Sequence, residues 1–312
     1  MNYRTLLPLS FAALLAVSAG AAELHVGEGQ TYAKPSDAAK AAQDGDTVVI
    51  HEGKYIGDVC AWTAANLTIQ GEGADKVIID AAGNIAWGKA VWVFTKGDVK
   101  VSGVTIRKAK CNEKNGTGIL LEGGFKGLCE IRECTFTKNE DGVRCGALPD
   151  CELLLEKCKF YKNGSGEGQS HNFYIGNIKK LTVRDCVSDH SNKGHALKSR
   201  AKETIVENCV FDDGDDGECA YLADFPNGGK VVVKNCKFVQ SNKASNSGLV
   251  AFGMEGNLHA ETSLDFQCNY LENRRENGAR FVIIGKGIDD DCISVGDDEN
   301  EYKGKGTDQL VD

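Results

Sequence analysis

The feature that most limits how this chain can fold is a short unit that recurs through most of its length. Each copy reads apolar, any residue, apolar, two polar residues, a cysteine or its equivalent, and an apolar residue two positions further on. Copies begin at residues 99, 129, 153, 181, 204 and 231, and a degenerate copy begins at 264. Recurrence at this interval indicates one supersecondary unit that is stacked many times.

The apolar alternation within each copy predicts short strands with one buried face. Gly, Asn and Asp between the copies predict turns. A leucine-rich repeat would need a tighter consensus, and a propeller blade would need longer hairpins. Units of this length with variable insertions are typical of a solenoid whose coils each contribute three short strands. We therefore predict an all-β fold, a single-stranded parallel β-helix.

Cysteines fill the same place in five successive copies: Cys134, Cys158, Cys186, Cys209 and Cys236. In a solenoid they should stack inward as a column, where an unpaired cysteine behaves as a small apolar side chain. The 13 cysteines of the chain are an odd number and cannot all pair within one molecule. Cys145, Cys151 and Cys219 lie off the column and either pair or stay unpaired. Asn208 and Asn235 predict the start of an interior amide ladder.

The two ends of the chain carry their own signals. Residues 35–43 predict one helix, with Pro35 in its first turn, which would cap the apolar end of the solenoid. Residues 281–284 predict the last strand of a domain spanning 23–286, and the acidic segment 287–312 predicts a mobile tail.

Residues 1–22 predict a cleaved signal peptide. Arg4 is followed by an interrupted apolar run and by small residues at 18–22. That run is too short for a stable membrane span. We therefore expect an exported protein, secreted or periplasmic, with no integral membrane association.

Charge is unevenly placed along the chain. The net charge is −9, but residues 287–312 hold nine acidic residues and two lysines, whereas residues 171–200 carry a net charge of +4. Because steering depends on the local field, an anionic polysaccharide is an acceptable partner. No basic stripe with interleaved aromatic residues is present, so we do not expect a nucleic acid partner. We expect the protein to be a monomer.

Chemically useful residues gather in segments that precede the repeat unit in successive coils: 171–176, 194–200, 218–224 and 247–255. Equivalent positions of a solenoid lie one strand spacing apart, so these segments should share one face. The candidate catalytic residues there are His171, Tyr174, His195, Lys198 and Arg200. The candidate substrate-binding residues are Asn172, Tyr221, Asp224 and Glu255.

Several motifs carry a family resemblance. The segment 38–55 resembles the opening of pectate-lyase-like right-handed β-helix proteins. The order of HNFY at 171–174, GHALKSR at 194–200, DFPNGG at 224–229 and VAFGMEG at 250–256 resembles a subgroup of bacterial right-handed parallel β-helix repeat proteins of largely undefined activity. The resemblance covers nearly the whole mature chain and implies a right-handed coil, but it implies function only weakly.

Many relatives of this fold are polysaccharide lyases. The Lys198-Ser199 pair is similar to the chondroitinase-B and alginate-lyase group, in which a lysine at such a position is the proton-abstracting base. This sequence departs from that group at two points. That group places carboxylates for Ca²⁺ just before the lysine, and none stands directly before Lys198. It also takes an arginine from the next coil, but residues 212–224 contain no Arg or Lys.

The candidate residues suit β-elimination at a uronic acid, which needs a neutralised carboxylate, a base and an acid. Arg200 suits carboxylate pairing. Lys198 suits the base role if Arg200 and burial lower its pKa. Tyr174, His171 or His195 could donate the proton. The alternatives are that Lys198 and Arg200 are ordinary ion-paired strand charges and that the histidines are structural.

Two other functions fit the pattern. A β-helix glycoside hydrolase would need paired carboxylates, for which Asp224 with Glu218 or Glu255 are the candidates. A non-catalytic glycan-binding or surface protein would use the same face without chemistry. The run 212–218 holds five carboxylates and two glycines, so Asp213, Asp215, Asp216 and Glu218 are candidate Ca²⁺ ligands or else a solvated acidic loop.

Overall fold

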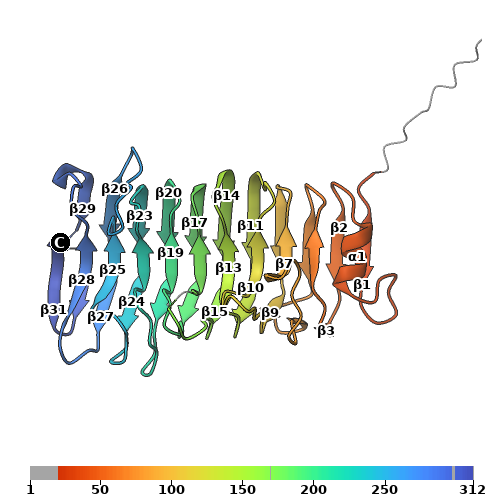
Figure 1. The fold of residues 1–312 in the computed structure, drawn as a ribbon, viewed down its shortest axis with the longest axis horizontal. Coiled ribbons are helices and arrows are strands. Elements are labelled where there is room, and N and C mark those ends of the chain that lie inside the picture. The colour runs from red at the N-terminus through yellow and green to blue at the C-terminus, as the bar shows by residue number, and fades with distance from the viewer. Residues whose placement is uncertain (1–19, 169, 297–298, 312) are drawn as a thin grey trace, which may run out of the picture.

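The computed structural model describes residues 20–168, 170–296 and 299–311. The chain winds through three parallel sheets that run the length of an elongated solenoid (Figure 1). The first sheet contains β1 (Glu23–Val26), β2 (Thr47–Ile50), β5 (Thr68–Gly71), β8 (Val99–Ser102), β11 (Gly127–Arg132), β14 (Leu148–Glu156), β17 (Ile178–Arg184), β20 (Glu203–Glu207), β23 (Lys230–Lys234), β26 (Ser263–Gln267) and β29 (Ile293–Val295).

The other two sheets complete each coil. The second contains β3 (Gly53–Ile56), β6 (Val77–Asp80), β9 (Thr105–Arg107), β12 (Thr135–Thr137), β15 (Lys159–Tyr161), β18 (Val187–Asp189), β21 (Val210–Asp212), β24 (Lys237–Gln240), β27 (Tyr270–Asn273) and β30 (Glu301–Lys303). The third contains β4 (Cys60–Trp62), β7 (Ala90–Phe94), β10 (Thr117–Leu121), β13 (Asp141–Cys145), β16 (Phe173–Ile175), β19 (Leu197–Ser199), β22 (Ala223–Phe225), β25 (Gly248–Phe252), β28 (Ala279–Ile284) and β31 (Gly306–Val311).

The register between coils confirms the repeat that the sequence predicts. The first residues of the successive repeat copies are direct partners in the first sheet: Val99, Cys129, Leu153, Leu181, Thr204, Val231 and Leu264. Apolar side chains from all three sheets fill the space between them. Insertions between copies are accommodated in loops, and the β14–β17 pair has a register shift between Leu148 and Glu152, ahead of its repeat copies.

The cysteine column is confirmed. Its five thiols are buried, and those of Cys209 and Cys236 lie 3.6 Å from the carbonyl oxygens of Val183 and Val206 in the preceding coil. Asn269 takes the next place in the column, where its Oδ1 accepts a hydrogen bond from the backbone N–H of Cys236. All 13 cysteines lie in the described residues and all are unpaired, the off-column ones included.

The amide ladder predicted from Asn208 and Asn235 forms, with Nδ2 of Asn235 donating to Oδ1 of Asn208 at 3.4 Å, but it lies on the surface and not in the interior. Both residues have positive φ angles, 55° and 54°, at the turn before the column cysteine, and both side chains are exposed. Asparagine is favoured there because it tolerates the left-handed conformation. An interior amide ladder exists at a different turn, where the backbone N–H of Asn139 donates to Oδ1 of Asn163 at 3.0 Å.

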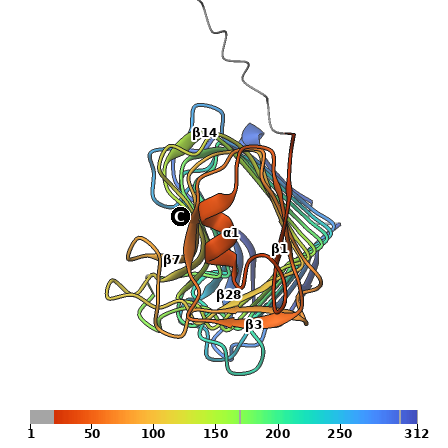
Figure 2. The same ribbon diagram turned by 90° about the vertical axis from the view of Figure 1, so that its right-hand side faces the viewer.

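The two ends of the solenoid differ in how well they were predicted. The N-terminal cap is confirmed: α1 (Pro35–Ala41) lies across the open end of the coil and buries Ala38 and Ala39 (Figure 2). The predicted leader falls mostly on residues 1–19, which lie outside the described residues. Among the described residues, no helix has the length and apolar character needed to cross a membrane.

The predicted last strand at 281–284 and the mobile acidic tail are wrong for most of the C-terminal segment. After the short 3₁₀ helix η1 (Asp290–Cys292), strands β29, β30 and β31 pair with β26, β27 and β28 and add one more coil. Ile293, Val295 and Tyr302 pack against the core. Ile288 packs there as well. The unpaired strand edges and apolar end of the preceding coil need to be covered, and the apolar side chains of the last coil cover them despite its acidic composition.

These burial differences predict a simple pattern of thiol reactivity. Cys268 is exposed, Cys111 and Cys292 are half-buried, and the other ten cysteines are buried. A thiol reagent such as 5,5′-dithiobis(2-nitrobenzoate) should therefore label Cys268 first in the native protein, and Cys268→Ser should remove that fast phase. The buried thiols should react only on unfolding. Rapid labelling of Cys209 or Cys186 would contradict the column.

Candidate functional site

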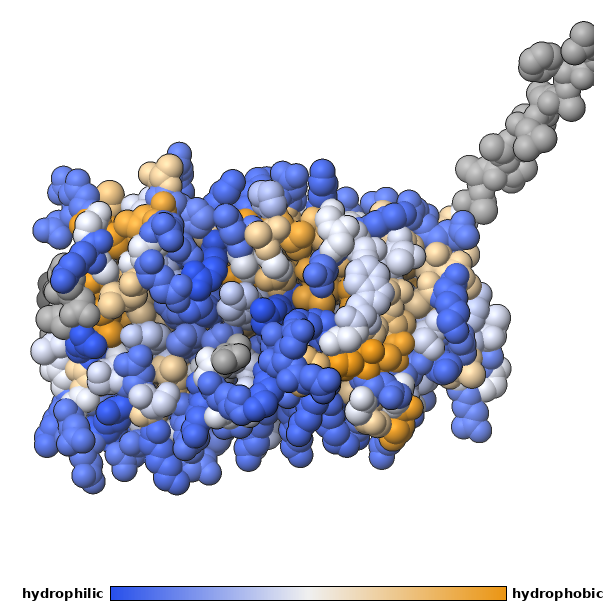
Figure 3. Space-filling model, viewed as in Figure 1, coloured by the Kyte–Doolittle hydropathy of each residue, from blue (hydrophilic) through white to orange (hydrophobic). Residues whose placement is uncertain are grey.

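The outer face of the third sheet carries a row of unlike side chains. Strand pairing places Arg144, Tyr174, Lys198 and Asp224 next to one another on β13, β16, β19 and β22. Towards the N-terminus the row continues into an apolar cluster that includes Val93 and Leu120. Figure 3 shows hydrophilic residues across the middle of this face and a hydrophobic patch nearer its N-terminal end.

The centre of the row is a network of two cations and two carboxylates. The Lys198 ammonium lies 2.9 Å from Oδ2 of Asp224 and 2.7 Å from Oε1 of Glu255. The Arg200 guanidinium lies 2.6 Å from the other oxygen of Glu255. Glu255 therefore bridges both cations with its two oxygens. This confirms that segments around residues 200, 224 and 255 meet on one face.

Burial divides the network into an inner and an outer part. The side chains of Asp224 and Lys198 are 4% and 10% exposed, whereas that of Glu255 is 47% exposed. Arg200 is also tied to Asn227, whose Oδ1 accepts a hydrogen bond of 2.6 Å from its Nη1. Asn227 was not identified as a site residue from the sequence, although it belongs to the DFPNGG motif that was singled out.

The pKa of Lys198 is raised, which corrects the expectation that it would be lowered. Burial alone would lower the pKa, but the charges and hydrogen bonds of Asp224 and Glu255 outweigh it. Burial raises the pKa of Asp224 in spite of the adjacent ammonium. For Glu255, burial acts upwards but the hydrogen bonds from Lys198 and Arg200 hold the pKa below its ordinary value. Lys198 is therefore a protonated cation in the resting site.

The two histidines form a stacked ladder beside this network. The rings of His171 and His195 lie 4.9 Å apart and nearly parallel, and Tyr221 stacks on His195 at 5.3 Å. The backbone N–H of His195 donates to Nδ1 of His171, and that of Tyr221 donates to Nδ1 of His195. An Nδ1 that accepts requires the hydrogen to be on Nε2 in the neutral ring.

The electrostatics of the ladder favour neutral rings. Burial, with a smaller effect from Lys198, lowers the pKa of His195 to about 3. Burial also lowers the pKa of His171 well below its ordinary value. A ring that is neutral throughout the ordinary pH range is a poor proton donor, so the expected acid role of His171 and His195 is not supported. Their geometry makes them positioning residues that fix the segments leading into β16, β19 and β22.

Tyr174 lies between the histidine ladder and the guanidinium groups of Arg144 and Arg200. Its ring stacks on His171 at 5.3 Å, and the guanidinium carbon of Arg144 lies 4.4 Å from the ring centroid. Arg144 donates to Oδ2 of the buried Asp141 at 2.8 Å, while Oδ1 of Asp141 accepts from the backbone N–H of His171. Burial raises the pKa of Asp141 to about 6.

Arg144 and Asp141 were missed in the sequence analysis. Arg144 could have been found from its position, because it holds the place of Tyr174 in the preceding coil. Their segment, DGVRC at 141–145, also precedes a repeat copy, but it does not resemble the segments that were singled out.

Asn172 faces the interior, so its expected substrate-binding role is wrong. Its Nδ2 donates to the Ser188 hydroxyl at 2.8 Å, and its Oδ1 accepts from Asn163. The register explains this: Ser188 is the partner of Phe160 and Phe211 in the second sheet, so an aromatic ring is missing from the core in that coil. The smaller Ser188 leaves a polar partner for the buried Asn172 amide at this level of the core.

The expected Ca²⁺ ligands do not converge. Asp213 is buried and accepts from the backbone N–H of Cys219, while Asp215 contacts Arg274, Asp216 contacts His190 and Glu218 contacts Lys193. Within the described ranges, no group of three or more His, Cys, Asp or Glu side chains could hold a metal ion. The four residues have different ion-pair and hydrogen-bond partners, so the proposed metal set is wrong as a single site.

The fold and this face define a right-handed parallel β-helix with a charged outer row. The pattern of right handed beta helix regions matches residues 89–264, more than half of the chain, and the protein belongs to that family. Comparison with curated protein sequences gives no significant match.

Solved structures agree with this architecture. The chain is similar to an alginate lyase from Paenibacillus sp. str. FPU-7, with a TM-score of 0.59 and 13% identity over 92% of this chain and 99% of that one. It is also similar to the pectin methylesterase PemA from Erwinia chrysanthemi, with a TM-score of 0.50 and 13% identity over 72% and 80%. At such identities the likeness establishes the fold.

The histidine ladder predicts a specific acid sensitivity. Because the pKa of His195 is lowered on folding, the unfolded chain binds a proton below pH ~6.5 that the native ring binds only near pH 3. As the pH falls through that window, this ring should therefore lower the free energy of unfolding by about 1.4 kcal/mol per pH unit. His195→Asn keeps an acceptor near the Nδ1 position but cannot titrate.

Urea unfolding at pH 6.5 and pH 4.5 tests this prediction. Wild-type stability should fall by about 2 kcal/mol more than that of His195→Asn between the two pH values. The carboxylates of the site titrate in both proteins, so their effects cancel in the difference. Equal losses of stability would show that His195 is not held neutral by burial.

Proposed function

We propose that this protein is an exported polysaccharide lyase that cleaves a uronate-containing glycan by β-elimination on the outer face of the third sheet. The observation that carries the proposal is the convergence of Lys198 and Arg200 on one exposed carboxylate, that of Glu255, beside the Tyr174 ring. A uronate presents the same chemical group. The similar folds of an alginate lyase and a pectin methylesterase, named for two uronate polymers, support a substrate of this class.

The cations of the site suit the first requirement of the reaction. The C5–H of a uronate becomes acidic only when the adjacent carboxylate is neutralised. Arg200 is permanently charged and presents a planar fork that can pair with both carboxylate oxygens. Its hydrogen bond to Asn227 holds the fork in place. Arg200 is therefore assigned to the substrate carboxylate, as in the sequence-based hypothesis.

The proton-transfer roles are assigned the other way round from that hypothesis. Lys198 is protonated at rest, which suits the acid that protonates the leaving glycosidic oxygen. Tyr174 is adjacent to Arg200, lies under the guanidinium of Arg144 and is one strand from Lys198, so it can contact the same sugar as both cations. After its hydroxyl proton has passed to solvent, the Tyr174 oxygen would take the C5 proton, a C4–C5 double bond would form, and the C4–O bond would break as the glycosidic oxygen receives the proton of Lys198.

The glycoside hydrolase alternative fits the arrangement less well. Glu218 pairs with Lys193, away from Asp224, and so drops out as a partner carboxylate. Asp224 and Glu255 both contact Lys198, but Asp224 is almost fully buried behind the ammonium. A hydrolase needs both carboxyl groups to face the scissile bond.

Activity measurements test the proposal directly. Alginate, pectate and glycosaminoglycans should be screened for the ultraviolet absorbance of an unsaturated uronate. Lys198→Ala and Tyr174→Phe should each lower kcat by about 10²–10⁴-fold, because each removes a proton-transfer group. Arg200→Ala should raise KM and lower kcat/KM. Lys180→Ala and Arg184→Ala are matched controls, since both residues lie on β17 of the first sheet.

The outcomes separate the three candidate functions. Unsaturated product that disappears in the site variants but not in the controls supports the lyase. Release of reducing sugar without unsaturated ends would indicate a hydrolase. Saturable binding without any product across the panel would indicate a glycan-binding protein.

A further inference from the structure

We propose that Glu255 is an internal stand-in for the substrate carboxylate, and that substrate binds by taking its place on Lys198 and Arg200. The inference rests on the proposed function, because it identifies the group that the site exchanges as the carboxylate of a uronate. It adds a self-blocking contact that neither the fold nor the family match assigns. The site then has two states, closed by Glu255 and opened by a carboxylated sugar.

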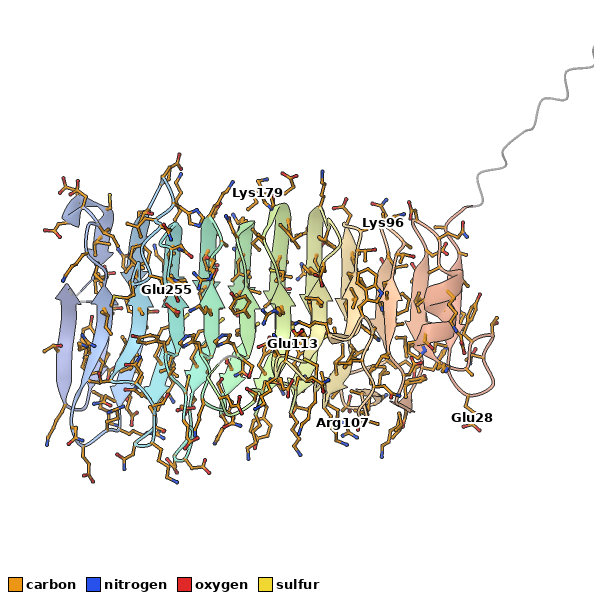
Figure 4. The ribbon with its side chains drawn as sticks, viewed as in Figure 1. Glu28, Lys96, Arg107, Glu113, Lys179 and Glu255 are labelled. Carbon is orange, nitrogen blue, oxygen red and sulfur yellow. The ribbon has the colours of Figure 1, made fainter. Side chains whose placement is uncertain are left out.

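The geometry of the contact resembles recognition of a ligand. One oxygen of Glu255 lies 2.7 Å from the Lys198 ammonium, and the other lies 2.6 Å from the Arg200 guanidinium. Two cations on one carboxylate are a common arrangement for carboxylate binding. Glu255 reaches them from the turn after β25, so the contact spans 57 residues of sequence to Lys198 and 55 to Arg200. Figure 4 shows Glu255 on the outer face, whereas Lys179 projects from an edge of the coil.

Charge balance indicates exchange and argues against the two carboxylates binding together. Asp224 compensates one of the two positive charges of Lys198 and Arg200. The remaining positive charge matches a single carboxylate, which is that of Glu255 at rest. A uronate bound beside Glu255 would leave the site with more negative than positive charge, and like charges in one site repel. Arg144 does not alter this count because Asp141 neutralises it.

Glu255 can leave without unfolding its turn. Its backbone N–H donates to the carbonyl of Pro226 at 3.0 Å, and Nδ2 of Asn227 donates to the carbonyl of Gly256. The backbone is therefore held, but the side chain is 47% exposed and needs only a rotation. A hollow of about 510 Å³ adjoins it, and Lys286 lines that hollow as an alternative cation.

Binding measurements with a catalytically silenced protein test the exchange. In a Tyr174→Phe background, tetrasaccharides of polymannuronate, polyguluronate and polygalacturonate are titrated by calorimetry. Glu255→Gln and Glu255→Ala should each bind the preferred tetrasaccharide about tenfold more tightly, because the competing carboxylate is gone. Glu130→Gln is the matched control, since Glu130 also contacts two cations, Arg132 and Lys100, but on the first sheet. It should bind like the parent.

A second measurement leaves Glu255 in place. With ¹³C-carboxyl glutamate, the resonance that Glu255→Gln removes should shift as the tetrasaccharide is added. Equal or weaker binding by the Glu255 variants, no binding by any protein, or an unmoved resonance would overturn the exchange. If the Glu255 variants bind more tightly but the wild type forms no unsaturated product, the lyase proposal would be wrong and the exchange would be supported. If the wild type has lyase activity but the Glu255 variants do not bind more tightly, the lyase proposal would be supported and the exchange would be wrong.

Discussion

The parallel register between successive coils is the constraint on which the rest of the structure depends. Each strand is hydrogen-bonded to its equivalents one coil before and one coil after, so a side chain has fixed neighbours about 4.8 Å away on either side. The same rule that stacks the cysteines inward aligns Tyr174, Lys198 and Asp224 outward. Loops of different length enter between coils without changing these rows. The site is therefore a consequence of the ladder, with residues from three coils held at one strand spacing.

Within the row, electrostatic compensation decides the character of each group. Lys198 is buried enough to need a partner, and Asp224 supplies it from the next strand. That pairing keeps the lysine charged, which suits the proton-donor role that we propose for it. The histidines show the opposite solution, because burial and the nearby cations keep them neutral, and their Nδ1 atoms bind backbone N–H groups. Two kinds of titratable residue on one face thus serve different purposes, one electrostatic and one positional.

Much of this arrangement could be predicted from the sequence because it follows from period and register. The repeat starts, the cysteine column, the capping helix and the meeting of residues near 174, 198, 224 and 255 are all consequences of coil length. What could not be predicted depends on side-chain direction and burial. Asn208 and Asn235 face outward because the turn there is left-handed, and Asn172 faces inward because Ser188 leaves a gap in the core.

The remaining errors have similar physical causes. The acidic composition of residues 287–312 concealed the apolar residues of a final coil, of which Ile288, Ile293, Val295 and Tyr302 pack against the core. The pKa of Lys198 was expected to follow Arg200, which is nearby in sequence, whereas Asp224 and Glu255 are closer in space. The carboxylates at 213–218 looked like a cation site because they are dense in sequence, but each has its own hydrogen-bond or ion-pair partner. Sequence proximity was a poor guide wherever neighbouring coils supplied the partner.

We propose that the outer row of the third sheet recognises the carboxylate of a uronate sugar. A crystal structure of the Tyr174→Phe variant with a bound uronate tetrasaccharide tests it most directly. We expect one sugar carboxylate against the Arg200 guanidinium, the ring of that sugar beside residue 174 and Lys198, and the Glu255 side chain turned away towards Lys286. A tetrasaccharide bound on another sheet, or one with no carboxylate near Arg200, would contradict it.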